Sequence, residues 1–170
     1  FYAESGGQVG DTGTIAFDGF DVKVFDTQKD GEEIIHICEN TENFEIKNDR
    51  VVATVQSQIR RLTEKNHTAT HLLHAALRQI LGNHVEQRGS LVEADRLRFD
   101  FTHLEKVNVS EIAEIEQLVN YKIQNNIPLR IEQDSFSNAK KRGAMALFGE
   151  KYGEEVRTVE IVDYSLELCG

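Results

Sequence analysis

The stretch Gln56–Leu81, QSQIRRLTEKNHTATHLLHAALRQIL, decides the fold of this 170-residue chain and holds most of its chemistry. It contains neither Gly nor Pro, and Gly82 follows it as a stop signal. At about 100° per residue, its apolar side chains fall in one arc, which predicts a long amphipathic helix. That arc, centred near Leu62 and Ile80, contains Ile59, Leu62, Ala69, Leu73, Ala76, Leu77 and Ile80.

Three histidines of the predicted helix, His67, His71 and His74, share one face, which lies away from the apolar arc. His67 and His71 stand at positions i and i+4, so both imidazoles can approach one point above a single turn. Two nitrogens placed in this way can bind a metal ion, although the same spacing also occurs on plain polar helix faces. His74 fits either packing at the edge of the core or support of a neighbouring ligand.

Cys169, in Leu168-Cys169-Gly170, is the candidate thiolate for such a site. Most free cysteines are small buried apolar residues, so core packing is the alternative reading. If Cys169 is a ligand, we expect a fourth ligand just past Gly170, and a mixed set of nitrogen and sulfur donors suits Zn²⁺. The remaining histidines stand alone in the sequence and are read as structural: His36, His84 and His103.

The rest of the chain predicts an α+β fold in two parts. Before the long helix, short β-rich runs separated by Gly, Asp and Asn turns predict a small β-barrel or meander: Gly13–Phe17, Phe20–Asp26, Glu33–Cys38 and Arg50–Val55. After it we expect strands over Val85–Glu93, Arg96–Thr102, Pro128–Gln133 and Glu155–Val162, and helices over Ser110–Asn125 and Ser135–Arg142. The predicted domains are a β-barrel subdomain over 1–55 and an α+β core over 56–170.

The second predicted helix should begin at Ser110, with Glu111 and Glu114 in its first turn. Its inward residues by periodicity are Ile112, Ile115, Leu118, Val119 and Ile123. The segment Gly143–Gly153 gives no clear periodicity.

The charge of the chain argues against a dedicated binder of phosphate backbones. Its formal net charge is −10, and residues 1–50 carry 12 of the 29 acidic residues. No apolar run approaches the roughly 18 residues of a membrane span, and no signal peptide opens the chain. Two cysteines make no disulfide framework, so we expect a reducing, cytoplasmic setting. We interpret the chain, which begins at Phe1, as a piece of a longer protein.

Five blocks, in order, closely resemble the editing domain of alanyl-tRNA synthetases. They are Phe1–Gln8 (FYAESGGQ), Asn66–Arg78 (NHTATHLLHAALR), Leu97–Phe101 (LRFDF), Gly143–Tyr152 (GAMALFGEKY) and Glu167–Gly170 (ELCG). The last block resembles the start of that family's Cys-Gly-Gly-Thr-His segment. The free-standing trans-editing relatives share the two-histidine helix and the Cys/His end.

The resemblance implies a β-barrel followed by a two-layer editing core related to that of threonyl-tRNA synthetase. It implies a metal ion, usually zinc, held by His67, His71 and Cys169, with a last histidine ligand beyond Gly170. Metal occupancy and catalysis by these 170 residues therefore depend on a ligand outside them. It also implies that Gln87 lines the editing pocket and hydrogen-bonds the substrate or the attacking water. The segment Ser5-Gly6-Gly7-Gln8 resembles a glycine-rich loop facing the same cleft.

The function implied is hydrolysis of mischarged Ser-tRNA(Ala) and Gly-tRNA(Ala). The partners would be the aminoacylated 3′ end of tRNA(Ala) and the other domains of a parent enzyme, which ligates alanine to tRNA(Ala) using ATP. The alternatives are a free-standing trans-editing deacylase and a metal-stabilised module that positions tRNA without activity. A metal-dependent protease or phosphatase is disfavoured, because residues 68–70 are Thr-Ala-Thr and supply no acidic group between the paired histidines.

Overall fold

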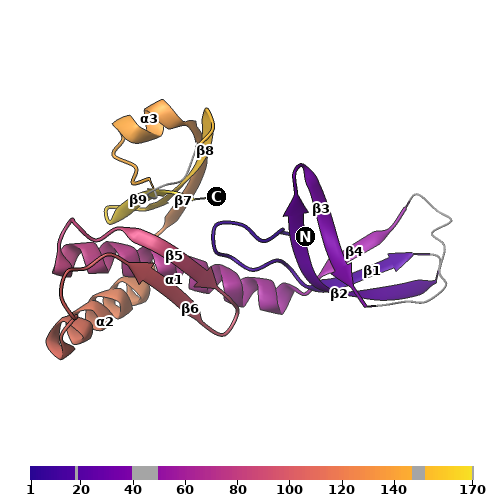
Figure 1. The fold of residues 1–170 in the computed structure, drawn as a ribbon, viewed down its shortest axis with the longest axis horizontal. Helices are drawn as coiled ribbons and strands as arrows, with labels where there is room; N and C mark the ends of the chain where they lie inside the picture. The colour runs from indigo at the N-terminus through magenta and orange to yellow at the C-terminus, as the bar shows by residue number, and fades with distance from the viewer. Residues whose placement is uncertain (18, 40–49, 147–151, 170) are drawn as a thin grey trace. The chain divides into compact units, whose positions relative to one another are not determined.

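The computed structural model describes residues 1–17, 19–39, 50–146 and 152–169. Three sheets and three helices make up this described part, which confirms the α+β class (Figure 1). The chain divides into two compact units, one of Phe1–Asn66 with Leu91–Leu97 and one of His67–Ser90 with Arg98–Gly170. The subdomain boundary expected near Val55 stays a prediction.

The first unit contains a four-stranded sheet in the order β3-β2-β1-β4. All its pairings are antiparallel, so β1 to β3 form a meander and β4 returns beside β1, which is a Greek-key order. Its strands are β1 (Gly13–Phe17), β2 (Phe20–Asp30), β3 (Glu33–Cys38) and β4 (Val52–Val55). Among the described residues β3 and β4 are the edges of an open sheet, so the meander is confirmed and a closed barrel is not seen.

A buried ion pair within the first unit ties its opening segment to the start of helix α1 (Ser57–Leu81). The Asp11 side chain is 6% exposed and accepts hydrogen bonds from Arg60 Nε, at 2.7 Å, and from a second guanidinium nitrogen. It also accepts one from the Tyr2 backbone N–H at 2.6 Å. Burial opposes ionisation, but Arg60 and Tyr2 outweigh it and lower the pKa of Asp11. The carboxylate of Asp11 therefore stays ionised and keeps its ion pair with the Arg60 guanidinium.

Helix α1 packs in the second unit against α2 (Val109–Gln124), against β6 (Leu97–Phe101) and against Val85, which precedes β5 (Gln87–Val92). The buried members of this helix cluster are Ala76, Leu77, Val85 and Ile115; packed against them are Leu73, Ile80, Leu81, Phe99, Phe101, Val107, Leu118 and Val119. Leu62 does not follow the predicted arc, because it is 39% exposed.

Helix α2 begins at Val109, one residue earlier than the sequence predicts. Its N-cap is Asn108, whose side chain accepts from the Glu111 N–H at 2.9 Å while Glu111 accepts from the Asn108 N–H at 2.8 Å. This reciprocal capping box satisfies two helix-end donors, so Ser110 lies inside the first turn. Two of the predicted inward residues, Ile112 and Ile123, are each 52% exposed, since α2 packs through its central stripe around Ile115.

The last part of the second unit in chain order is a three-stranded antiparallel sheet. Its central strand is β8 (Glu155–Ile161), which pairs with β7 (Leu129–Ser135) and β9 (Ser165–Leu168). Helix α3 (Phe136–Lys141) lies against it and begins at the N-cap Ser135. The sheet cluster beneath α3 contains Ala139, Ala144, Val156 and Leu168, with Phe136, Tyr152 and Leu166 packed against it.

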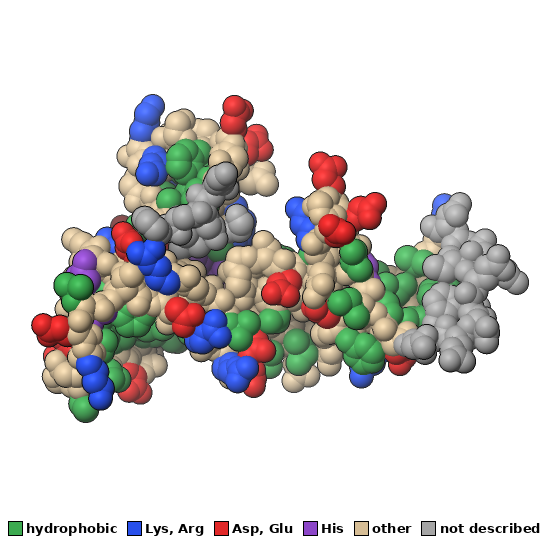
Figure 2. All heavy atoms as spheres, in the orientation of Figure 1, with side chains coloured by type: hydrophobic (Ala, Val, Ile, Leu, Met, Phe, Trp, Pro, Cys, Tyr) green, Lys and Arg blue, Asp and Glu red, His purple; other side chains and the backbone are tan. Residues whose placement is uncertain are grey.

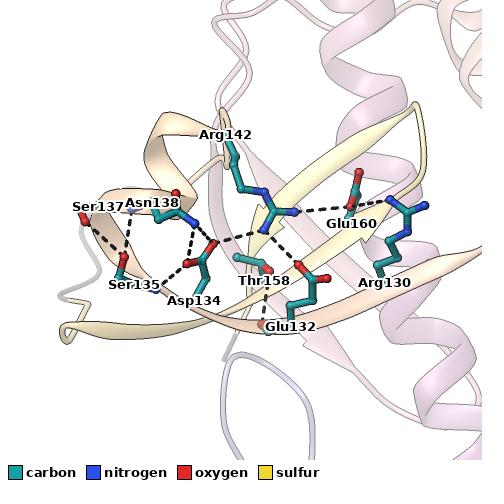
Figure 3. A network of polar contacts seen from close by, with 9 residues as sticks. All are labelled: Arg130, Glu132, Asp134, Ser135, Ser137, Asn138, Arg142, Thr158 and Glu160. Carbon is teal, nitrogen blue, oxygen red and sulfur yellow. Dashed lines mark hydrogen bonds and ion pairs between the residues drawn. The ribbon is translucent and has the colours of Figure 1, made fainter.

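Polar contacts complete this α3 face of the sheet. Arg142, at the end of α3, forms ion pairs with Glu132, Asp134 and Glu160 (Figure 3). Asp134 also accepts from the Asn138 side-chain amide at 2.8 Å. This face of the sheet is therefore occupied by its own helix and its own salt bridges.

The described surface matches the mixed charge of the sequence. Figure 2 shows acidic and basic side chains interspersed over the described part of the face in view. No helix among the described residues is both long and apolar enough to cross a membrane.

We expect Asp11→Asn to lower the free energy of unfolding by about 2–3 kcal/mol, because it leaves Arg60 without its buried counter-charge. Urea unfolding followed by circular dichroism measures the loss. The matched control is Glu64→Gln, which removes the exposed partner of the same Arg60 at 3.7 Å and should cost less than about 1 kcal/mol. Equal losses in the two variants would contradict the assignment.

Candidate metal centre

The alternation of β9 sends its side chains to two faces of the sheet. Leu166 and Leu168 pack into the sheet cluster, so Glu167 projects to the opposite face, as does Cys169 one step beyond the strand. The strand is held at both edges, since Glu167 pairs with Val159 of β8 and forms a parallel bridge with Met145. The backbone thus fixes where the carboxylate and the thiol can reach.

The structure brings together the three residues that the sequence singles out as metal ligands. His67 Nε2 lies 3.0 Å from Cys169 Sγ. The His67 and His71 rings stack, with centroids 5.2 Å apart and planes inclined by 16°. One ligand atom from each of His67, His71 and Cys169 lies within 4.8 Å of the other two. The i, i+4 spacing on α1 and the end of β9 therefore converge on one point.

Glu167 is a member of this site that the sequence analysis missed. Its Oε2 lies 2.6 Å from His71 Nδ1, and its Oε1 lies 3.0 Å from His74 Nδ1. The side chain is only 3% exposed. The signal was present in Ser-Leu-Glu-Leu-Cys, residues 165–169, where apolar and polar residues alternate and place a carboxylate beside the candidate thiolate.

The histidine face of α1 is buried, contrary to the expectation that it lies away from the core. His71 is 8% exposed and His74 is 5% exposed, whereas His67 is half-buried. Glu167 of β9 covers this face of α1, and it lies 96 residues further along the chain than His71. A helical wheel of α1 alone contains no information about a partner so distant in sequence.

Three buried groups of the site, His71, Glu167 and Cys169, have shifted pKa values. Burial opposes each charge, but Cys169 and Glu167 raise the pKa of His71 to about 9. In the same way His67 and His71 lower the pKa of Cys169 to about 6, and His71 and His74 lower that of Glu167 to about 2. At neutral pH Cys169 is therefore a thiolate, which is the form that binds metal ions.

The donor set fits a zinc-type ion. Two imidazoles and one thiolate are the ligands that Zn²⁺ prefers, and ligand atoms around a tetrahedral ion lie about 3–4 Å apart. His71 Nε2 is buried with no hydrogen-bond partner among the described residues. A buried nitrogen without a partner is costly unless something occupies it, and a metal ion would do so.

The glycine-rich segment near the amino terminus forms a tight turn in the first unit. The Ser5 and Gln8 backbones exchange hydrogen bonds of 3.2 and 2.9 Å, and the residues between them, Gly6 and Gly7, have φ of 57° and 83°. Two consecutive positive φ values define a type I′ turn and favour glycine at both positions. Gln8 is buried, and the Val92 N–H donates to the Gly7 carbonyl at 2.7 Å. A role for Ser5–Gln8 in substrate binding stays a prediction.

Gln87 begins β5 and belongs to the second unit. Its side-chain amide donates to Ser90 Oγ at 3.2 Å and is half-buried. This contact fixes the amide locally, and the predicted contact of Gln87 with substrate or water stays a prediction.

Comparison with known proteins first gives a family match over part of the chain. The family described as tRNA synthetases class II (A) matches residues 1–59. The full chain is then similar to alanine–tRNA ligases. It is 54% identical over 172 aligned residues to the ligase of Pseudoalteromonas translucida, 52% over 170 to that of Francisella tularensis subsp. novicida, and 49% over 170 to that of Hydrogenovibrio crunogenus.

Each of these alignments covers 100% of the chain and 20% of the ligase. The chain is therefore homologous, from end to end, to one segment of alanine–tRNA ligases, and it spans about a fifth of their length. The alanyl-tRNA synthetase resemblance drawn from the sequence is confirmed at this level.

The metal-free chain should lose stability in acid through Glu167. Its pKa falls from 4.5 to about 2 on folding, so its contribution is complete above pH 4.5 and is lost as pH drops toward 2. The size is on the order of 3 kcal/mol. Thermal unfolding between about pH 6 and pH 2.5 measures it, with Glu167→Gln as the comparison. The unmodified chain should fall more steeply below pH 4.5, and parallel profiles would contradict the assignment.

Proposed function

We propose that the chain is the editing portion of an alanine–tRNA ligase and hydrolyses Ser-tRNA(Ala) and Gly-tRNA(Ala). The observation that carries the proposal is the convergence of His67, His71 and Cys169 in a chain homologous over its full length to alanine–tRNA ligases. The resemblance of its sequence blocks to editing domains supports the same assignment. In this proposal residues 1–55 form the barrel-like subdomain and residues 56–170 an editing core related to that of threonyl-tRNA synthetase.

A ligase for alanine needs such a second site for a physical reason. A pocket shaped for a small apolar side chain rejects an added hydroxyl by only about 10²-fold, so serine is admitted. Glycine lacks one methyl group, which is worth only about 1–3 kcal/mol. Hydrolysis of the wrong product at a separate site supplies the discrimination that binding cannot provide.

In this proposal His67, His71 and Cys169 hold a Zn²⁺ ion. When bound, the ion supplies a Lewis acid that can acidify water, polarise the ester carbonyl or anchor the substrate's amino group. Gln87 donates or accepts a hydrogen bond to the substrate or the attacking water. The Ser5–Gln8 turn offers backbone groups to the aminoacylated end of tRNA.

The reaction is the hydrolysis of an ester. The oxygen of water adds to the aminoacyl carbonyl carbon, and the bond from that carbon to the tRNA 3′ oxygen breaks. The leaving oxygen takes up one proton of the water, and the water oxygen with its second hydrogen remains on the free amino acid as part of the carboxyl group. Intact tRNA(Ala) and serine or glycine are the products.

The remaining activities belong in this proposal to the longer ligase. Its other domains activate alanine with ATP and transfer it to tRNA(Ala), and a cytoplasmic location follows from that role. The described part of this chain offers interspersed charges and no continuous basic stripe in the face of Figure 2. Most of the contacts that bind the tRNA backbone are therefore assigned to those other domains.

The test is deacylation of Ser-tRNA(Ala) by the full-length ligase that contains this chain. His67→Ala and Cys169→Ala should each lower the deacylation rate by about 100-fold or more, while alanylation of tRNA(Ala) stays unchanged. The matched control is His84→Ala, which removes an exposed imidazole of the same unit that bonds His103 at 2.9 Å. Undiminished deacylation in the His67 and Cys169 variants would overturn the proposal and leave a structural metal module.

A further inference from the structure

We infer that Glu167 is a positioning residue of the metal centre, whose carboxylate holds the Nδ1 protons of both His71 and His74 so that His71 presents Nε2 to the ion. The inference rests on the metal site of the proposed function. It states which ring nitrogen of His71 and of His74 carries the proton.

The two contacts use different oxygens of one carboxylate. Oε2 lies 2.6 Å from His71 Nδ1, and Oε1 lies 3.0 Å from His74 Nδ1. An ionised carboxylate offers only acceptors, so both ring nitrogens that face it must be the donors. A neutral imidazole that donates through Nδ1 keeps its lone pair on Nε2. In the neutral form of each ring, the geometry therefore places the proton on Nδ1.

His71 Nε2 is the atom that the site needs. It is buried with no hydrogen-bond partner among the described residues, and His71 belongs to the group of three ligand residues with His67 and Cys169. His71 Nδ1 is already engaged by Glu167 at 2.6 Å, so it is not free to bind an ion. A carboxylate behind a ligating imidazole in this way also fixes the ring's orientation and raises its basicity.

His74 helps to fix the position of the Glu167 carboxylate. It stands one turn beyond His71 on α1, its ring packs against Phe99 with centroids 5.3 Å apart, and it is 5% exposed. The backbone of Glu167 is fixed by Val159 on one side and Met145 on the other. With both oxygens bonded and the strand held, the carboxylate has no freedom to turn away from His71.

The first test reads the tautomers directly in the unmodified, zinc-loaded chain. Labelling with ¹⁵N-histidine gives six rings, which long-range ¹H–¹⁵N correlation spectra can resolve. His71 and His74 should both carry a proton on Nδ1, and His71 Nε2 should carry none. A His71 ring that binds zinc through Nδ1, or that keeps its proton on Nε2, overturns the inference. Because no tRNA is involved, this result is independent of deacylation.

The second test compares zinc affinity among variants by competition with a chromophoric chelator. Glu167→Gln keeps the size but has one acceptor oxygen and one donor amide, so one of the two rings must change tautomer. Affinity should fall about 10–100-fold. The matched control is Glu160→Gln, which removes a carboxylate bonded to Arg142 on the α3 face of the same sheet and should leave affinity unchanged.

Wild-type affinity in a folded Glu167→Gln chain overturns the inference. If that variant does not fold, the tautomers of the unmodified chain decide. If the tautomers are as stated and the full-length ligase does not deacylate Ser-tRNA(Ala), the proposed function fails while the role of Glu167 stands.

Discussion

One buried carboxylate, that of Glu167, joins the two halves of the candidate site. It links two histidines of α1 to a strand 93 and 96 residues further along the chain. Removing an ionised group from water is costly, and two imidazole donors at 2.6 and 3.0 Å offset that cost. The alternation of β9 then carries Cys169 to the same face, where its sulfur lies 3.0 Å from His67. The metal centre depends on this docking of strand and helix.

Helix α1 and strand β9 each use one face for packing and another face for chemistry. Helix α1 buries Ala76 and Leu77 on one side and turns its histidines toward β9 on the other. Strand β9 buries Leu166 and Leu168 beneath α3, where Arg142 and its carboxylate partners complete the cover (Figure 3). Because both elements are anchored by apolar faces, their polar faces are held rigidly, as a metal site requires.

The sequence predicts the helices and strands whose bounds depend on residues a few positions apart. The long helix was expected over 56–81 and is Ser57–Leu81, and the strands Gly13–Phe17 and Glu33–Cys38 agree at both ends, because periodicity and turn residues act within a few positions. It does not predict the burial of His71 and His74 or the part played by Glu167, because those depend on a strand about a hundred residues away. His84 and His103 are likewise read as isolated, because the contact of 2.9 Å that joins them spans 19 residues of the chain.

The central claim is that two imidazoles of α1 and the thiolate after β9 bind one ion together. X-ray absorption at the zinc edge of the loaded chain tests it most directly, because sulfur and nitrogen ligands differ in distance, about 2.3 Å against 2.0–2.1 Å. The account predicts one sulfur and at least two imidazole nitrogens per ion. A zinc ion surrounded only by nitrogen and oxygen, with no sulfur, would contradict it.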